Sequence, residues 1–239
     1  LSSMSSPAIA PAALKRLTAG GRGVVPSSYV LGFKHYTLAA PALRNIYRTN
    51  GGSEAFYSAQ ALGRMGDLQS ASILLEGLER RRGESAAGAA WALGALRSRE
   101  AVDPMIQILR RGRETNLKKH CVAALGEIGD RKAVSAILEI PLTEQLEMGD
   151  LLGRSLAKLG GEDVFRFMRD HLDSSDENER IIGRFILVHF RGPDRVDFFL
   201  ELLTNEDSRT RSAAITALRR NTGKSFGTER QWLEWAGAR

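Results

Sequence analysis

Ala59-Gln-Ala-Leu-Gly-Arg-Met-Gly-Asp67 is the first clear copy of a motif that recurs along this chain. The motif returns as Ala90-Trp-Ala-Leu-Gly-Ala-Leu96 and as Val122-Ala-Ala-Leu-Gly-Glu-Ile-Gly-Asp130, with a weaker copy at Arg154-Ser-Leu-Ala-Lys-Leu-Gly160. The central leucines keep a period of 31 or 32 residues, from Leu62 through Leu93, Leu125, Leu156 and Leu187 to Leu218, and one period before Leu62 lies Leu31. We call these seven residues the anchor leucines. Their register predicts a repeat protein of about seven units.

Each unit carries a second apolar segment after its anchor. In residues 102–109, apolar side chains recur three and four positions apart, which is the pattern of a helix with one buried face. The corresponding segments of other units are 71–78, 133–140, 164–171 and 196–203. Gly66 and Gly129 are expected to end anchor helices in the left-handed conformation, and Asp67 and Asp130 to cap the helices that follow. Because the connections are short, consecutive helices are expected to pack antiparallel.

These patterns predict an all-α fold, a right-handed α-solenoid of about six to seven helix pairs over residues 29–221. The composition agrees, since 43% of the residues are hydrophobic and only 7% are aromatic, which suits close-packed helices better than a β-sandwich. Small residues flank the anchors, among them Gly63, Ala92, Gly94 and Ala124. They are expected to let neighbouring units approach closely.

The repeated pattern Ala-Leu-Gly-x-Ile/Leu-Gly-Asp, at a period of 31, resembles the short HEAT-like repeats of the phycobilin-lyase type. The resemblance covers residues 30–220. It implies an α-solenoid of the kind that is widespread among bacterial scaffold proteins. It says little about activity, because the motif residues are core and turn residues.

The two ends differ from the repeats. Residues 1–28 are rich in Ser, Pro, Ala and Gly, and we expect a flexible segment in which residues 9–17 form a short helix over the first repeat. Residues 222–239 resemble the Thr-Gly-x-x-Phe-Gly…Trp-x-x-Trp cap at the ends of many bacterial HEAT-repeat proteins. Thr228 and Gln231 predict a capping box, and Trp232 and Trp235 are expected to seal the last repeat.

The sequence offers little catalytic chemistry. None of the four histidines, His35, His120, His171 and His189, is followed by Glu, unlike the His-Glu pairs with which HEAT-like deoxyhypusine hydroxylases hold iron. The only cysteine, Cys121, lies in an Ala/Leu-rich run and is expected to be buried and inert. The acidic run 173–179 fits helix capping better than acid/base chemistry. We therefore expect a protein without enzymatic activity, metal or cofactor.

No apolar run reaches the length of a membrane span, so we expect no transmembrane helix. We expect a cytoplasmic protein, or a periplasmic one if a signal peptide has been removed.

Charge is unevenly distributed. Residues 1–120 hold 17 Lys and Arg against 8 Asp and Glu, a balance of +9, and residues 121–239 hold 17 against 20, a balance of −3. A nucleic-acid track would be basic along its whole length. An acidic protein partner, or self-association through opposite ends, fits this distribution at least as well.

Candidate binding residues lie opposite the buried stripe of each anchor helix. Positions six and two before the anchor leucine and two after it share that side, which is expected to face the groove. We call these positions the anchor face. Its candidate partner-binding residues are Arg64, Trp91, Lys119, Glu127, Arg154, Lys158 and Phe185. For Trp91 and Phe185 the alternative is burial against the next unit, and for the lone cations a solvated face.

A second candidate surface is a basic ridge at the turns inside the early units. It comprises Arg80, Arg81, Arg82, Arg110, Arg111 and Arg113, with Lys118 and Lys119 following. The matching turns of later units, 173–179 and 205–207, are acidic.

These features favour a non-catalytic scaffold that binds another protein through the anchor face and the ridge. One alternative is a nucleic-acid binder like the HEAT-like alkylpurine DNA glycosylases, although the Asp expected near a groove aromatic is replaced by Ala95 one turn after Trp91. Another is a bilin-lyase-like enzyme, which the shared repeat alone does not establish.

Overall fold

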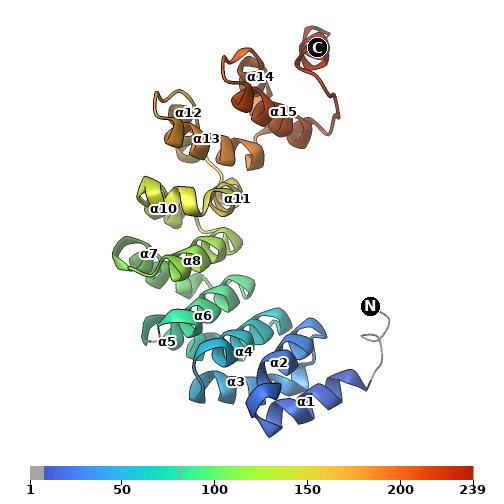
Figure 1. The fold of residues 1–239 in the computed structure, drawn as a ribbon, viewed down its shortest axis with the longest axis vertical. Helices are drawn as coiled ribbons and strands as arrows, with labels where there is room; N and C mark the ends of the chain where they lie inside the picture. Colours follow the sequence, from blue (N-terminus) through green and yellow to red (C-terminus); the bar gives the residue numbers. More distant parts are fainter. Residues whose placement is uncertain (1–7, 81, 239) are drawn as a thin grey trace. The chain divides into compact units, whose positions relative to one another are not determined.

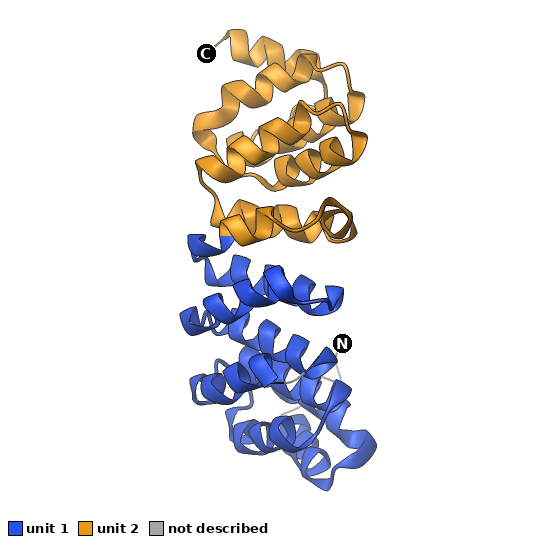
Figure 2. Ribbon diagram, turned by 90° about the vertical axis from the view of Figure 1, so that its left-hand side faces the viewer, with its two compact units in different colours: residues 1–133 blue, residues 134–239 orange. Residues whose placement is uncertain are grey.

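The computed structural model describes residues 8–80 and 82–238, and all regular structure among them is helical (Figure 1). The fold class is therefore the expected all-α solenoid, built from successive helix pairs. The chain divides into two compact units, residues 1–133 and 134–239 (Figure 2).

Unit 1 contains four anchor helices that alternate with a second set of helices, called outer helices for their place between the anchors in the sequence. The anchor helices are α2 (Val24–Phe33), α4 (Gly52–Met65), α6 (Gly83–Ala95) and α8 (Thr115–Ile128). The others are α1 (Ile9–Ala19), α3 (Ala40–Thr49), α5 (Ala71–Arg80) and α7 (Val102–Arg111). Short 3-10 turns lead into the outer helices, at η3 (Thr37–Ala39), η4 (Leu68–Ser70) and η5 (Arg99–Ala101), and η2 (Gly21–Gly23) and η6 (Arg131–Ala133) lie near the ends. Each anchor helix packs on the next, as α2 on α4, α4 on α6 and α6 on α8.

Unit 2 repeats the pattern with three anchor helices, α11 (Gly149–Leu159), α13 (Glu177–His189) and α15 (Ser208–Thr222). The remaining helices are α9 (Val134–Leu138), α10 (Leu142–Glu147), α12 (Glu162–Leu172), α14 (Val196–Glu201) and α16 (Glu229–Gly237), with 3-10 turns η7 (Pro193–Arg195) and η8 (Leu202–Thr204). The single helix expected over 133–140 is shorter, and α10 follows it after Pro141, which lacks the N–H that a continuing helix needs. The Gln145 side chain donates to the Ile140 carbonyl at 2.7 Å and so closes this break.

The anchor leucines occupy equivalent places. All seven lie on α2, α4, α6, α8, α11, α13 and α15, and all are 0% exposed. The predicted register of the repeats is therefore confirmed.

Small residues bring the anchor helices of unit 1 into backbone contact. A Cβ atom on Gly32 would lie 2.7 Å from the Cα of Ala61, and one on Gly94 would lie 2.6 Å from the Cα of Ala124. Carbon atoms in contact stand about 3.5–4 Å apart, so no larger residue fits at these glycines. The expected close approach of neighbouring repeats is confirmed within unit 1.

The turns follow the prediction in part. Gly66 and Gly129 are left-handed, with φ of 70° and 78°, and the Asp130 carboxylate accepts from the backbone N–H of Lys132 at 3.0 Å. The prediction that Asp67 caps the helix that follows it was wrong. Its carboxylate accepts from the Ser70 hydroxyl at 2.9 Å and pairs with Arg44 at 3.1 Å, and it makes no capping hydrogen bond to the backbone at the start of η4.

Helix α1 covers the first repeat, as expected. Its buried residues Ala10, Ala13 and Leu17 join one apolar cluster with Leu31 and Leu43. Residues 24–28 belong to α2 and not to a flexible segment. Helix α2 therefore begins at Val24, before the expected start of the repeat region at residue 29.

Helix α16 packs on α14 at the other end of the chain. Thr228 and Gln231 form the predicted capping box, and Trp232 is 0% exposed with its ring 5.0 Å from that of Phe226. The Arg211–Glu229 ion pair, at 2.8 Å, ties α16 to α15. Trp232 therefore seals the last repeat, whereas Trp235 is only half-buried.

Candidate functional site

Unit 1 presents aromatic and cationic side chains on its anchor helices. The guanidinium carbon of Arg64 lies 5.1 Å from the Tyr29 ring centroid and 5.5 Å from the Trp91 ring centroid. Tyr29 in turn stacks on Phe33, with centroids 6.4 Å apart and planes inclined by 11°. Tyr29 and Phe33 are 45% and 55% exposed. We call Tyr29, Phe33, Arg64 and Trp91 the aromatic face.

The repeat geometry places these four residues together. Tyr29, Phe33, Arg64 and Trp91 all stand two positions before or after an anchor leucine, on α2, α4 and α6. Because the glycines draw these helices together, one guanidinium reaches rings on both neighbouring helices. Trp91 is half-buried by this arrangement rather than fully enclosed.

Tyr29 and Phe33 were missed by the sequence analysis. The same positions, counted from Leu31, would have found both residues. Among the predicted site residues on α8, Lys119 is half-buried and Glu127 is exposed.

The thiol of Cys121 lies inside helix α8's packed side, away from the anchor face. Cys121 is 0% exposed, and burial raises the pKa of its thiol far above the ordinary value. His120 stands edge-on to Phe56, with ring centroids 5.6 Å apart, and burial lowers its pKa. The predicted burial of Cys121 is confirmed.

The anchor face of unit 2 carries a chain of polar contacts across three helices. Arg154 pairs with Asp150 at 2.9 Å, His189 Nε2 lies 2.7 Å from Asp150 Oδ1, and Arg220 reaches His189 Nδ1 at 2.9 Å. Because Arg220 can only donate, Nδ1 accepts and Nε2 donates to the carboxylate. The hydrogen bond from His189, aided by the Arg154 and Arg220 charges, holds the pKa of Asp150 below its ordinary value.

Phe185 and Lys158 are the other predicted site residues of unit 2. A Cβ on Gly149 would lie 2.3 Å from a ring carbon of Phe185, so the Phe185 ring packs over this glycine and is half-buried. Phe185 thus follows the alternative of packing against the neighbouring helix. Lys158 is exposed.

The arginines of the predicted basic ridge divide into two groups. Arg82, Arg111 and Arg113 line one cavity of about 590 Å³ in unit 1. Arg80 and Arg110 are exposed but do not line it, and Arg80 pairs with Glu76 at 2.8 Å. Arg81 lies outside the described residues. Lys118 does not belong to the ridge, because it stands seven residues before Leu125, on the buried side of α8, and is 6% exposed.

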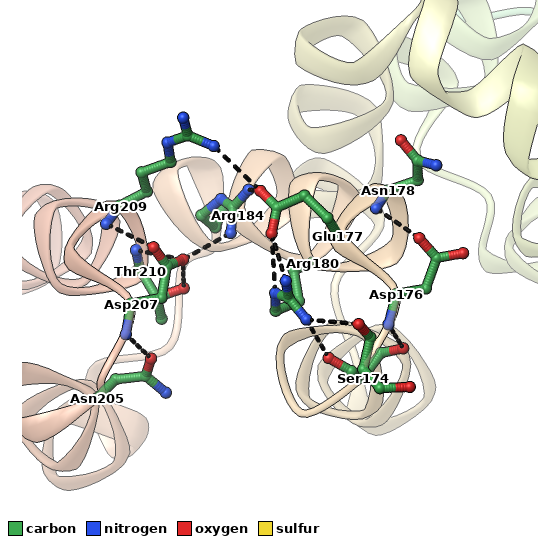
Figure 3. A network of polar contacts seen from close by, with 11 residues as sticks. Ser174, Asp176, Glu177, Asn178, Arg180, Arg184, Asn205, Asp207, Arg209 and Thr210 are labelled. Carbon is green, nitrogen blue, oxygen red and sulfur yellow. Dashed lines mark hydrogen bonds and ion pairs between the residues drawn. The ribbon is translucent and has the colours of Figure 1, made fainter.

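The acidic turns of unit 2 are paired internally. The Glu177 carboxylate accepts from Arg180 and Arg184, each at 2.6 Å, and from Arg209 at 3.2 Å (Figure 3). Asp207 accepts from Arg184 at 2.7 Å and caps α15 through the backbone N–H groups of Arg209 and Thr210. The capping interpretation of these turns is confirmed for Asp207 and for Asp176, which caps α13.

These contacts shift both carboxylates in one direction. Hydrogen bonds from Arg184 and Arg180 lower the pKa of Glu177. Burial alone would raise the pKa of Asp207, but the Thr210 hydroxyl, two backbone N–H groups and the Arg184 charge outweigh it and lower the pKa. Both carboxylates therefore stay ionised at pH values below those at which Glu and Asp side chains are ordinarily protonated.

The described residues contain no group of three or more His, Cys, Asp or Glu side chains placed to hold a metal ion. Within the same residues, no helix has the length and apolar character needed to cross a membrane.

Comparisons with known proteins agree with the helical architecture. A family profile described as HEAT repeats matches residues 74–147, and one described as PBS lyase HEAT-like repeat matches residues 55–80. No curated protein sequence matches the chain.

Two solved structures are similar. One is the complex of CpcE and CpcF of phycocyanin lyase from Nostoc sp. PCC7120, with a TM-score of 0.56, 18% identity and coverage of 96% of this chain and 94% of that chain. The other is an engineered protein, with a TM-score of 0.47, 16% identity and coverage of 86% of this chain and 66% of that chain. At 18% identity the first likeness shows a shared fold.

Proposed function

The chain is a HEAT-like repeat protein, and we propose that it is a scaffold that binds a protein partner through the aromatic face of unit 1. The observation that carries the proposal is Arg64 held between Tyr29 and Trp91 on a surface where Tyr29 and Phe33 stay largely exposed. Aromatic and arginine side chains concentrate binding energy at protein interfaces. An exposed apolar cluster rimmed by polar groups marks an interaction site more often than a solvated surface.

The geometry also favours tight binding at this face. Arg64 already rests on two rings, so little side-chain entropy is lost when a partner covers it. The stacked pair Tyr29 and Phe33 presents flat, rigid area beside it. A partner with an apolar patch and a nearby carboxylate complements this arrangement.

Two broader facts support a protein as the partner. The solved CpcE structure is of a complex with a second protein, CpcF. Unit 1 of this chain holds 19 Lys and Arg against 10 Asp and Glu, a balance of +9, which favours an acidic partner surface.

The test compares capture of a partner by matched variants. The chain is immobilised, exposed to an extract of its source organism, and crosslinked. A Tyr29→Ala/Arg64→Ala/Trp91→Ala variant is expected to lose a protein that the unaltered chain retains. Leu38→Ala is the control, because Leu38 is 71% exposed on unit 1 but lies outside the aromatic face. Equal recovery by the triple variant would overturn the proposal.

A duplex DNA titration tests the nucleic-acid alternative. We expect at most weak binding at low salt. Micromolar affinity that falls steeply with salt, and that requires Trp91, would replace the protein-partner proposal with nucleic-acid binding.

The second candidate function is phycocyanin-lyase-type activity, favoured by a likeness to the CpcE–CpcF complex that spans nearly the whole chain. It is tested by mixing the chain with a bilin, alone and with a phycocyanin apoprotein, and following the absorbance. Binding without transfer, or no spectral change, removes this candidate.

A further inference from the structure

A cavity lies at the turns that join α5 to α6 and α7 to α8 in unit 1. Its volume is about 590 Å³, within the range of ordinary ligand sites, and its apolar lining includes Leu78, Pro104, Ile108 and Leu117. Leu78 and Leu117 are buried residues of the core. The floor is therefore apolar and set by side chains that the fold already holds in place.

Three arginines surround this floor. Arg82 follows α5, Arg111 ends α7, and Arg113 lies two residues later in the next turn. Within residues 8–80 and 82–238, the guanidinium groups of Arg111 and Arg113 make no hydrogen bond or ion pair. We call this site the arginine pocket.

Backbone geometry brings Arg111 and Arg113 to the same pocket. A Cβ on Gly112 would lie 2.5 Å from the Ile108 carbonyl oxygen, whereas Gly112 itself donates its N–H to that oxygen at 2.7 Å. The tight exit from α7 thus depends on glycine and places the two arginines on either side of it.

Three arginines against two glutamates leave the lining of the pocket with a net charge of +1. The Glu114 carboxylate accepts from the backbone N–H of Gly83 at 2.9 Å, and so joins the two turns across one repeat. The Arg82 guanidinium donates to the Glu79 backbone carbonyl at 3.2 Å, which holds Arg82 over the rim. The remaining lining charge is positive.

We propose that the arginine pocket binds an acidic peptide segment that inserts one large apolar side chain onto the floor while its carboxylates pair with Arg111 and Arg113. Arginine binds carboxylates through two parallel hydrogen bonds, so two unpaired arginines select acidic residues on either side of the inserted one. The apolar floor adds the requirement for an aliphatic or aromatic side chain. A nucleic-acid backbone, which has no apolar side chain to insert, would leave this floor uncovered.

This inference rests on the proposed function only in taking the partner to be a protein. It concerns a different surface, at the turns and not on the aromatic face. The two proposals can therefore fail separately.

The test uses the full chain and three fluorescein-labelled ten-residue peptides. The first has a central Leu flanked by two Glu on each side, the second replaces the Leu by Ser, and the third replaces each Glu by Gln. Fluorescence anisotropy is expected to show binding of the first peptide and binding weaker by about tenfold or more for the second and third.

The variants locate the site. Arg111→Glu/Arg113→Glu is expected to weaken the first peptide about tenfold or more, and Arg166→Glu, an exposed arginine of α12 in unit 2, to change binding less than twofold. The Tyr29→Ala/Arg64→Ala/Trp91→Ala variant should bind the peptide like the unaltered chain. Failure of the acidic Leu peptide to bind, equal binding of the Ser peptide, or binding that survives in Arg111→Glu/Arg113→Glu overturns the inference. Stronger, competing binding of a DNA duplex does so too.

Discussion

Gly63 of α4 packs on the backbone of α6 so closely that a Cβ atom on it would lie 2.8 Å from the Cα of Ala92. Since a helical glycine otherwise costs about 1 kcal/mol relative to alanine, its presence there is explained by this contact. We expect Gly63→Ala to lower the free energy of unfolding by about 1–3 kcal/mol, because the helices must separate. Urea unfolding followed by circular dichroism measures the loss.

A matched glycine separates the packing effect from helix propensity. Gly237, the last residue of α16, would place a Cβ in open space. Gly237→Ala should leave stability unchanged or raise it by up to about 1 kcal/mol. If Gly63→Ala and Gly237→Ala behaved alike, the backbone contact between α4 and α6 would not be the reason for the small residue.

Arg184 is the central link between α13 and α15. Its side chain is only 10% exposed and reaches Glu177 and Asp207 at once. Replacing it by Ala removes the cation that Glu177 and Asp207 share, and we expect a loss of about 2–3 kcal/mol in urea unfolding.

Arg209 is the natural comparison for Arg184. It also contacts Glu177, but its side chain is 73% exposed. Solvent screens such a pair, so Arg209→Ala should cost about 0–1 kcal/mol. Equal losses for the two variants would contradict the distinction between a buried bridge and a surface contact.

The carboxylates of unit 2 predict the pH dependence of stability. Asp150, Glu177 and Asp207 have pKa values lowered from the ordinary 3.8 and 4.5, so near those values the unfolded chain binds more protons than the folded one. Their stabilisation is complete above the ordinary values and is lost as pH falls through the lowered ones. The melting temperature should therefore fall on acidification, and less steeply in Asp207→Asn. An unchanged slope in that variant would show that Asp207 does not contribute.

The fold was predictable because its signal is local and periodic. Leu62 and Leu93 stand one repeat apart, and the glycines beside them report how near the next helix must come. The anchor face followed from the same count, which is why it reached Arg64 and Trp91. Extending the count to Leu31 would have added Tyr29.

What the period could not supply were the particular contacts that side chains make with neighbouring repeats. The Glu177–Arg209 contact joins residues 32 apart, and the Gly83–Glu114 hydrogen bond joins residues 31 apart. Whether such residues meet depends on rotamers and on the turn between helices. For the same reason, the charge run at 80–82 predicted a ridge but did not distinguish Arg82, which lines the pocket, from Arg80, which does not.

The end cap should be a principal source of stability for unit 2, because Trp232 is fully enclosed there. Trp232→Ala removes the largest buried side chain of the cap and should cost about 3–5 kcal/mol. Within the described part of the chain, the indole Nε1–H of Trp232 finds no hydrogen-bond partner. Trp232→Phe therefore removes an unsatisfied donor as well as ring area, and the two effects partly offset.

We expect Trp232→Phe to cost about 1 kcal/mol and Trp235→Ala, at a half-buried position, about 1–2 kcal/mol. Urea unfolding of the three variants ranks them, and intrinsic fluorescence separates the contributions of the two tryptophans. A Trp232→Ala protein as stable as Trp235→Ala would show that α16 rests on the last repeat without closing it.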